Sequence, residues 1–387
     1  MIILNNGIAS AEGITALGKH IGIKKNKKDF AVIFSTKIAN AAALFTKNKV
    51  RGAPIFVNKK HLKNEKAQAI VINSGISNVC TGKKGIEDAY LMAELTAKEL
   101  SIKKENVLVA STGRIGVFLP MDKIKEGIKN IKKELSKKSS DAAEAILTTD
   151  TCKKQVSVKI GNIKIGAIAK GSGMIHPNMA TMLAFIATDA EIKPKKLKKM
   201  LVNSVDKSFN MVSVDRDTST SDMVILMANG LAGKIDDNKF QKALDFVCIE
   251  LAKKIARDGE GATKLIEVNV KNASSENSAR KIARAVISSN LVKSAVFGND
   301  PNWGRIMAAI GYSGADIREE KIDIYFGNEK IIEKGIAKNF DYKKIKKIMN
   351  NDKLSITIDL NRGNYSSTAY GCDLTYDYVK INAEYHT

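Results

Sequence analysis

One threonine in this sequence is well placed for covalent chemistry. The run Lys170-Gly171-Ser172-Gly173-Met174-Ile175-His176-Pro177-Asn178-Met179-Ala180 leads directly into Thr181, which opens an apolar stretch. A Thr hydroxyl is a weak nucleophile, but chain cleavage before Thr181 puts a free α-amine on the same residue. That amine has a pKa near ~7.7–8.0, so at neutral pH part of it is uncharged and can take the hydroxyl proton. Such a nucleophile needs neither a metal ion nor a histidine.

The same residues also have an ordinary structural explanation. Gly-Ser-Gly is a common turn and Thr commonly begins a strand, so this segment by itself fits an unremarkable strand start better than self-cleavage. Two more polar segments, residues 73–82 and 110–116, follow apolar runs, and strand ends are where binding sites form. The Thr112-Gly113 step can direct an amide or hydroxyl toward one point, as an oxyanion hole does, although alone it is more often a plain turn.

Six segments in this order resemble the ornithine acetyltransferase family, also called glutamate N-acetyltransferases, of arginine biosynthesis. They are residues 111–116 (STGRIG), 148–151 (TTDT), 170–189, 258–264 (DGEGATK), 298–305 (GNDPNWGR) and 382–387 (NAEYHT). The set is collinear and spans nearly the whole chain, which makes it far more specific than any one of its members.

The resemblance implies an α/β fold in which mixed sheets are layered with helices, the self-cleaving N-terminal-nucleophile fold of DmpA and the ornithine acetyltransferases. It implies cleavage between Ala180 and Thr181 into an alpha chain, residues 1–180, and a beta chain, residues 181–387. The two chains are expected to stay associated and to pair into a heterotetramer. Thr181 would carry an acetyl group from N-acetyl-L-ornithine to L-glutamate, and Thr112 and Gly113 would form the oxyanion hole.

The resemblance also implies a set of substrate contacts. They are Thr181 itself, Thr149 and Thr151, Lys170, Glu260, Asn382 and Thr387. Spacing does not fix which Thr of residues 148–151 touches the substrate. A substrate with an α-carboxylate and a side-chain ammonium or carboxylate needs a cation such as Lys170 and an anion such as Glu260. Outside this context the two charges would belong to the surface, and residues 382 and 387 to a frayed tail.

One position departs from the family pattern. Where the family usually has a Gly between two carboxylates, this chain has Arg216 between Asp215 and Asp217. The departure predicts a locally altered turn and leaves the reaction untouched, because the loop is not among the residues carried over as catalytic.

Composition excludes several classes of protein. The 387 residues are 44% hydrophobic and 27% charged, and no window approaches the ~18 uninterrupted apolar residues of a membrane helix. The four cysteines are scattered and the four histidines lack ligand spacing, which predicts a cytoplasmic protein without disulfides or metal. No cofactor is expected, while acetyl-CoA stays open as a second acetyl donor. The net charge of +22 is spread over lysine-rich segments with few aromatic residues, which argues against nucleic acid as a partner.

Periodicity predicts an alternation of strands and helices in one continuous body. The expected strands are residues 30–35, 54–58, 67–73, 106–111, 155–169, 182–188, 223–228, 264–270, 322–326, 355–360 and 378–384. The expected helices are residues 86–100, 121–135, 194–208, 238–256 and 341–349. Gly161-Asn162 predicts a hairpin turn inside residues 155–169, so part of the sheet should be antiparallel.

Two other functions compete with acetyl transfer. An aminopeptidase or amidase on a related self-cleaving scaffold differs only in using water instead of glutamate as the acyl acceptor. A basic nucleic-acid-binding protein predicts an affinity that falls steeply as salt rises.

Overall fold

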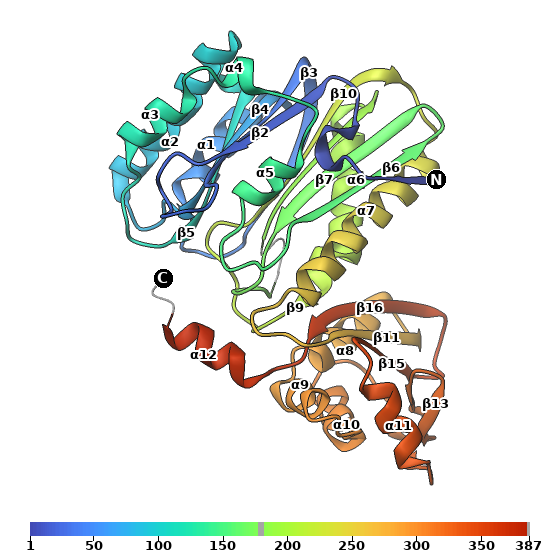
Figure 1. The fold of residues 1–387 in the computed structure, drawn as a ribbon. Helices are drawn as coiled ribbons and strands as arrows, with labels where there is room; N and C mark the ends of the chain where they lie inside the picture. Colours follow the sequence, from blue (N-terminus) through green and yellow to red (C-terminus); the bar gives the residue numbers. More distant parts are fainter. Residues whose placement is uncertain (177–181, 385–387) are drawn as a thin grey trace.

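The computed structural model describes residues 1–176 and 182–384. In these ranges the strands form a nine-stranded and a seven-stranded sheet (Figure 1). Three of the predicted site residues, Ala180, Thr181 and Thr387, lie outside the described residues.

All strands of the nine-stranded sheet come from the first 233 residues. Its order is β1 (Ile2–Leu4), β6 (Lys154–Ile160), β7 (Ile163–Lys170), β8 (Leu183–Ala190), β10 (Met223–Gly233), β3 (Phe30–Phe45), β4 (Lys66–Ile76) and β5 (Val107–Arg114), with β2 (Ile14–Lys19) added to β3. The pairs β8–β10 and β4–β5 are parallel and the other neighbours antiparallel. Gly161-Asn162 forms the predicted turn between β6 and β7.

The long strand β3 bends this sheet back on itself. Asn73 of β4 pairs with Phe30 at one end of β3, and Met223 of β10 pairs with Phe45 at the other. Yet Ser77, just after β4, and Ser221, just before β10, line the same pocket. The bend coincides with exposed residues 36–38, where the β3–β4 register shifts.

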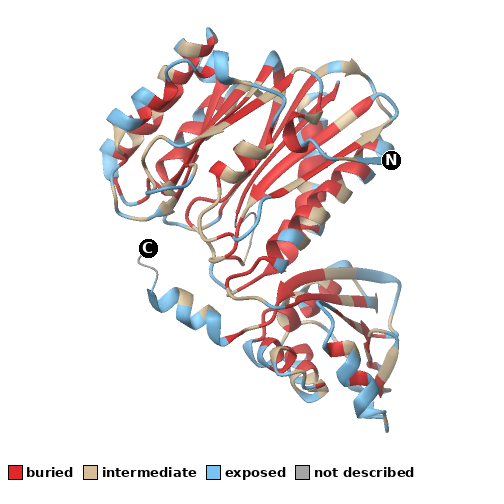
Figure 2. Ribbon diagram, in the orientation of Figure 1, coloured by how far each residue is buried: buried red, intermediate tan, exposed pale blue. Residues whose placement is uncertain are grey.

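Side-chain alternation along β4 shows the layers that result. Ile70 and Ile72 pack into a core between the two halves of the sheet, together with Phe185 of β8. Ala69 and Val71 face the other way, toward the helices α1 (Ala53–His61) and α2 (Gly82–Leu100). Two strand layers therefore lie between helices, as Figure 1 shows, and Figure 2 shows their strands buried.

Two more helices cover the opposite outer face. Leu201 of α6 (Pro194–Lys207) and Leu244 of α7 (Asp237–Arg257) belong to one hydrophobic cluster; α7 packs on β6, and α6 packs on β3 and on α7. The same hydrophobic cluster continues into the smaller sheet, where it includes Ile266 and Ile356. That sheet has the order β14 (Ile336–Ala337), β13 (Glu329–Glu333), β12 (Asp323–Phe326), β15 (Lys353–Asp359), β11 (Leu265–Ala273), β16 (Tyr365–Cys372) and β9 (Val212–Ser213).

The remaining helices are short. In the first half they are α3 (Met121–Ile128), α4 (Ile131–Glu134) and α5 (Ser140–Ala145). Beside the smaller sheet they are α8 (Glu276–Ile287), α9 (Asn290–Phe297), α10 (Trp303–Gly311) and α11 (Tyr342–Met349), and α12 (Tyr376–Glu384) ends the described chain.

Two predicted strands are wrong. Residues 54–58 lie in α1, because Pro54 occupies the first turn of a helix, where its missing N–H needs no partner. Residues 378–384 lie in α12, where the Thr375 hydroxyl accepts a hydrogen bond from the Tyr378 amide at 3.3 Å and caps the first turn.

The predicted helix over residues 121–135 is broken. Asn130 adopts a left-handed φ of 63° and separates α3 from α4. Helices α8, α9 and α10 were not predicted at all, although Ser275, Ser289 and Asn302 each cap one of them by accepting the amide hydrogen bond of the residue three positions on.

Candidate functional site

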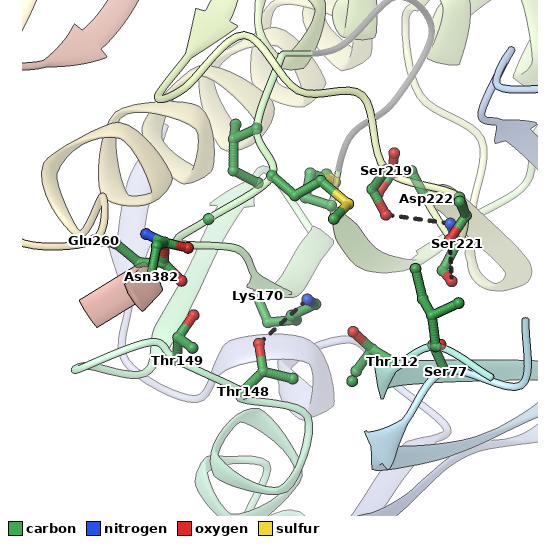
Figure 3. A pocket seen from close by; sticks show the side chains of 17 residues that line it. Ser77, Thr112, Thr148, Thr149, Lys170, Ser219, Ser221, Asp222, Glu260 and Asn382 are labelled. Atoms are coloured by element: carbon green, nitrogen blue, oxygen red, sulfur yellow. Dashed lines mark hydrogen bonds between the residues drawn. The ribbon is translucent and has the colours of Figure 1, made fainter. Parts of the chain in front are cut away.

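A polar pocket lies where the bent sheet brings its strand ends together (Figure 3). It is lined by Ser77, Thr112, Gly113, Ile115, Thr148, Thr149, Lys170, Gly173, Met174, Ile175, Met182, Ser219, Thr220, Ser221, Asp222, Glu260 and Asn382. In Figure 3, Thr112, Ser77 and Asp222 lie at one end, Glu260, Asn382 and Thr149 at the other, and Lys170 between them.

Two adjacent glycines shape the end that holds Thr112. Gly113 has φ +126° and pairs with Gly75, which has φ +103°, on the neighbouring parallel strand. A Cβ on Gly113 would lie 2.3 Å from the carbonyl carbon of Gly75. The site therefore requires glycine at residue 113, both for its backbone conformation and for the close approach of β4 and β5.

Lys170 supplies the positive charge of the pocket. It is the last residue of β7, and its Nζ donates to Thr148 Oγ1 at 3.4 Å. Burial lowers the pKa of Lys170, and the carboxylates of Asp150 and Asp222 oppose that shift. An ammonium held in such surroundings interacts strongly with any anion that enters, because little water screens it.

A fully buried ion network supports this wall of the pocket. Lys154 Nζ contacts Asp150 Oδ1 at 2.6 Å and Asp258 Oδ2 at 2.5 Å. Asp150 also accepts the amide hydrogen bond of Gly171 at 2.7 Å and that of Thr148 at 3.0 Å. Burial would raise the pKa of Asp150, but Lys154 and Lys170 outweigh it and lower the pKa to about 2. The network thus fixes the loop before β6 to the segment after β7.

The opposite end carries the negative charge. Glu260 follows α7, and Asn382 of α12 donates from Nδ2 to Glu260 Oε2 at 2.8 Å. The Glu260 amide donates to the Ser172 carbonyl at 3.1 Å. A Cβ on Gly173 would lie 2.3 Å from Glu260 Oε2, so glycine at residue 173 makes room for that carboxylate.

The loop before β10 adds a carboxyl group and hydroxyls that the sequence reasoning did not assign. Ser219, Thr220, Ser221 and Asp222 all line the pocket. Burial raises the pKa of Asp222 well above its usual range, against the opposing effects of Ser219 and Lys170. A hydroxyl-rich run that ends in a carboxylate directly before an apolar strand was the available signal.

The same loop contains the position that departs from the family pattern. Arg216 adopts φ +72°, so it keeps the left-handed conformation that suits a glycine. Asp215 before it accepts the Met174 amide at 2.6 Å and the Ile175 amide at 2.9 Å. Nearby, burial and the charges of Arg284 and Arg216 lower the pKa of His176 to about 4, so its ring is neutral at physiological pH.

The structure brings together six of the site residues that the sequence predicts. Thr112, Gly113, Thr149, Lys170, Glu260 and Asn382 line one pocket. Thr151 is exposed and absent from the lining, and its amide donates to Asp258 Oδ2 at 3.1 Å. Of the threonines in residues 148–151, the pocket lining therefore includes Thr148 and Thr149 but not Thr151. Ala180, Thr181 and Thr387 cannot be placed, since they are outside the described ranges.

The described part of the chain has the features of neither a metal centre nor a membrane-spanning helix. Residues 1–176 and 182–384 contain no group of three or more His, Cys, Asp or Glu side chains able to hold a metal ion. No helix there is long and apolar enough to cross a bilayer.

Fold, site and known relatives together define an acyltransferase with a mixed α/β fold. The chain belongs to the ArgJ family, whose model matches residues 15–387. It is 50% identical over its whole length to the arginine biosynthesis bifunctional protein ArgJ of Caldanaerobacter subterraneus, and 52% identical to ArgJ 1 of Clostridium acetobutylicum, of which it covers 100% and 99%.

A solved structure shares part of this fold. The crystal structure of ArgJ from Bacillus halodurans superposes with a TM-score of 0.50 at 44% identity, over 51% of this chain and 96% of that one.

Proposed function

We propose that this protein transfers an acetyl group from N-acetyl-L-ornithine to L-glutamate through an acetyl ester on Thr181. The observation that carries the proposal is the arrangement of Lys170 and Glu260 at separate points of one pocket that also contains the Thr112-Gly113 step. Both amino acids carry an α-carboxylate, and each also carries an ammonium or an amine at some stage of the reaction. A fixed cation and a fixed anion suit both, and one site can serve both half-reactions.

Each group has a proposed part in the reaction. The Thr181 α-amine takes the hydroxyl proton while Thr181 Oγ attacks the acetyl carbonyl. Thr112 and Gly113 hold the resulting oxyanion, a contribution worth about 2.7–4 kcal/mol per donor in comparable enzymes. Lys170 binds the substrate carboxylate, and Glu260, oriented by Asn382, binds the ammonium. Thr149 and Thr387 complete the substrate contacts.

The sheet explains how the chain could be cut between Ala180 and Thr181 without falling apart. Strands β8 and β10 of the 181–387 segment lie between β7 and β3 of the 1–180 segment. Six residue pairs join β7 to β8, from Ile165–Thr188 to Lys170–Leu183. The Bacillus halodurans chain, which matches 51% of this one, has the length expected of one such fragment. We extend the proposal to a heterotetramer of two alpha and two beta chains, which native mass measurement tests.

Two finer assignments accompany this function. The word "bifunctional" in the names of the curated relatives supports acetyl-CoA as a second donor, which would make the enzyme an amino-acid N-acetyltransferase as well. Incubation with acetyl-CoA and glutamate, without N-acetylornithine, tests this by formation of N-acetylglutamate. The four free cysteines support a reducing compartment, the cytoplasm.

The decisive assay compares acceptors. With N-acetylornithine as donor, ornithine release should depend on glutamate and should match N-acetylglutamate formation mole for mole. Release at the same rate without glutamate would instead identify the amidase alternative. Thr181→Ala should stay uncut and inactive, and a cleaved, active Thr181→Ala protein would contradict the proposal.

A further inference from the structure

A buried carboxyl oxygen in the pocket has no hydrogen-bond partner. Asp222 is only 3% exposed, yet in the described part of the chain nothing donates to its Oδ2. Other buried side-chain atoms share this lack, including Asp88 Oδ2, but among them Asp222 is the one that lines the pocket. An unpaired buried carboxyl oxygen is unfavourable by about 1–3 kcal/mol or more, so its position calls for a ligand.

The backbone holds Asp222 firmly at this place. Its carbonyl accepts the Thr46 amide at 3.0 Å, and the next amide, of Met223, donates to the Met182 carbonyl at 3.0 Å. Asp222 is therefore fixed between the end of β3 and the segment that begins β8. In Figure 3 it lies at the same end of the pocket as Thr112.

Few charged groups face this carboxyl. The titratable side chains of the pocket lining are Lys170 from β7, Glu260 after α7, and Asp222 itself, and the remainder are hydroxyl, amide or apolar groups and glycine. Glu260 lies at the far end, where Asn382 binds it. The Ser219 hydroxyl and the opposite charge of Lys170 act on Asp222, and both oppose the effect of burial on its pKa.

We propose that Asp222 is a catalytic residue that exchanges a proton with the substrate nitrogen in both halves of the acetyl transfer. The inference rests on the proposed function. In the first half, Thr181 Oγ gives its proton to the α-amine as it bonds to the acetyl carbon, the C–N bond of N-acetylornithine breaks, and protonated Asp222 gives its proton to the leaving nitrogen. In the second half, the glutamate amine bonds to the acetyl carbon and loses a proton to ionised Asp222. The C–O bond then breaks and Thr181 Oγ regains its proton from the α-ammonium.

This exchange keeps the count of protons balanced. The proton that leaves Asp222 in the first half returns to it in the second, so neither solvent nor a metal ion has to supply one. A carboxyl whose pKa is raised by burial suits the task, because it holds its proton to a higher pH than an exposed carboxyl does and can therefore both give and take one.

Half-reactions of Asp222→Asn test the proposal. The substitution keeps the shape of the side chain and removes the titratable proton. Acetylation of the 181–387 fragment by N-acetylornithine, followed by quenched mass measurement, should be slower by about 100-fold or more. In the unsubstituted protein that acetylation should slow as pH rises through the Asp222 pKa, and deacetylation by glutamate should speed up. In the Asp222→Asn protein, neither rate should show this dependence on pH.

Asp88→Asn is the matched control. Asp88 is a buried carboxylate of α2 with an unpaired Oδ2, and it lies outside the pocket lining. The Asp88→Asn protein should keep the wild-type rates of acetylation and deacetylation and the pH dependence of each. Wild-type rates and pH dependence in Asp222→Asn would overturn the proposal.

A second variant covers the case in which Asp222→Asn is not cut. The Asp222→Ala substitution leaves room for a small acid, so added formate should restore the rate of acetylation in proportion to its concentration. The same concentration of sodium chloride should not. No rescue, or an uncut Asp222→Ala protein that melts like the wild type, counts against the proposal. Absence of acetylation in the unsubstituted protein would instead reject the proposed function itself.

Discussion

Gly113→Ala gives the sharpest link between backbone geometry and catalysis in this pocket. The added Cβ would lie 2.3 Å from the Gly75 carbonyl carbon and 2.7 Å from its Cα, whereas ordinary contact begins at 3.4 Å. Both neighbours are backbone atoms and cannot rotate away. Strands β4 and β5 must therefore separate by about 1 Å at the proposed oxyanion hole, a displacement that costs on the order of 100-fold in rate.

Loss of one hydrogen-bond donor to the oxyanion would slow the reaction by a similar factor. Removing one donor lowers kcat by about 10²–10³ in comparable enzymes. We therefore expect Gly113→Ala to lose that factor in ornithine release at saturating glutamate, and to be cut more slowly between Ala180 and Thr181.

A substitution at the nearby Gly116 is the control that separates backbone strain from an effect on catalysis. Gly116 also has a positive φ, +77°, but its added Cβ would meet nothing within 4 Å. Gly116→Ala should lose roughly 1–2 kcal/mol of stability through the left-handed backbone and keep the wild-type kcat. Folded Gly113→Ala protein with wild-type kcat and cleavage would refute the reasoning.

Four further outcomes follow from the described contacts. Lys154→Met removes the cation that contacts two buried carboxylates, so urea unfolding should show a loss of roughly 3–5 kcal/mol, and an unchanged midpoint would contradict this. Arg216→Gly relieves a left-handed arginine and should raise the free energy of unfolding by up to about 1 kcal/mol; a lowered midpoint would argue against strain there. The pKa of Asp150 falls from 3.8 to about 2 on folding, so its contribution to stability is complete above the unfolded value and disappears as pH drops toward 2, which acid titration of the melting temperature with and without Asp150→Asn measures. Thr149→Val should raise KM for N-acetylornithine, whereas Thr151→Val, outside the pocket, should not.

Six residues of the pocket lining could be predicted from the sequence because each stands in a short local segment. The Thr112-Gly113 step, Lys170 and Glu260 each stand in a short motif at the end of a strand or helix, and the structure brings these ends together. Strand and helix alternation was readable for the same reason, since periodicity is a property of neighbouring residues.

The errors come from interactions that no short window contains. The apolar run at residues 54–58 fits a strand or a helix equally well. In the structure it is helical, and Asn58 at its end donates a hydrogen bond to the distant Val109 carbonyl at 2.8 Å. The sequence assigns no role to Asp222, because its importance depends on its burial in the folded pocket, within the influence of Lys170. The bend of β3 could not be foreseen, since only the pairing of both its ends reveals it.

The intact mass of the denatured protein, with and without N-acetylornithine, tests the central claim most directly. We predict two fragments that meet between Ala180 and Thr181, with one acetyl group added to the second fragment when the donor is present and removed again by glutamate. A single mass for all 387 residues, unchanged by the donor, would contradict both the cleavage and the covalent intermediate.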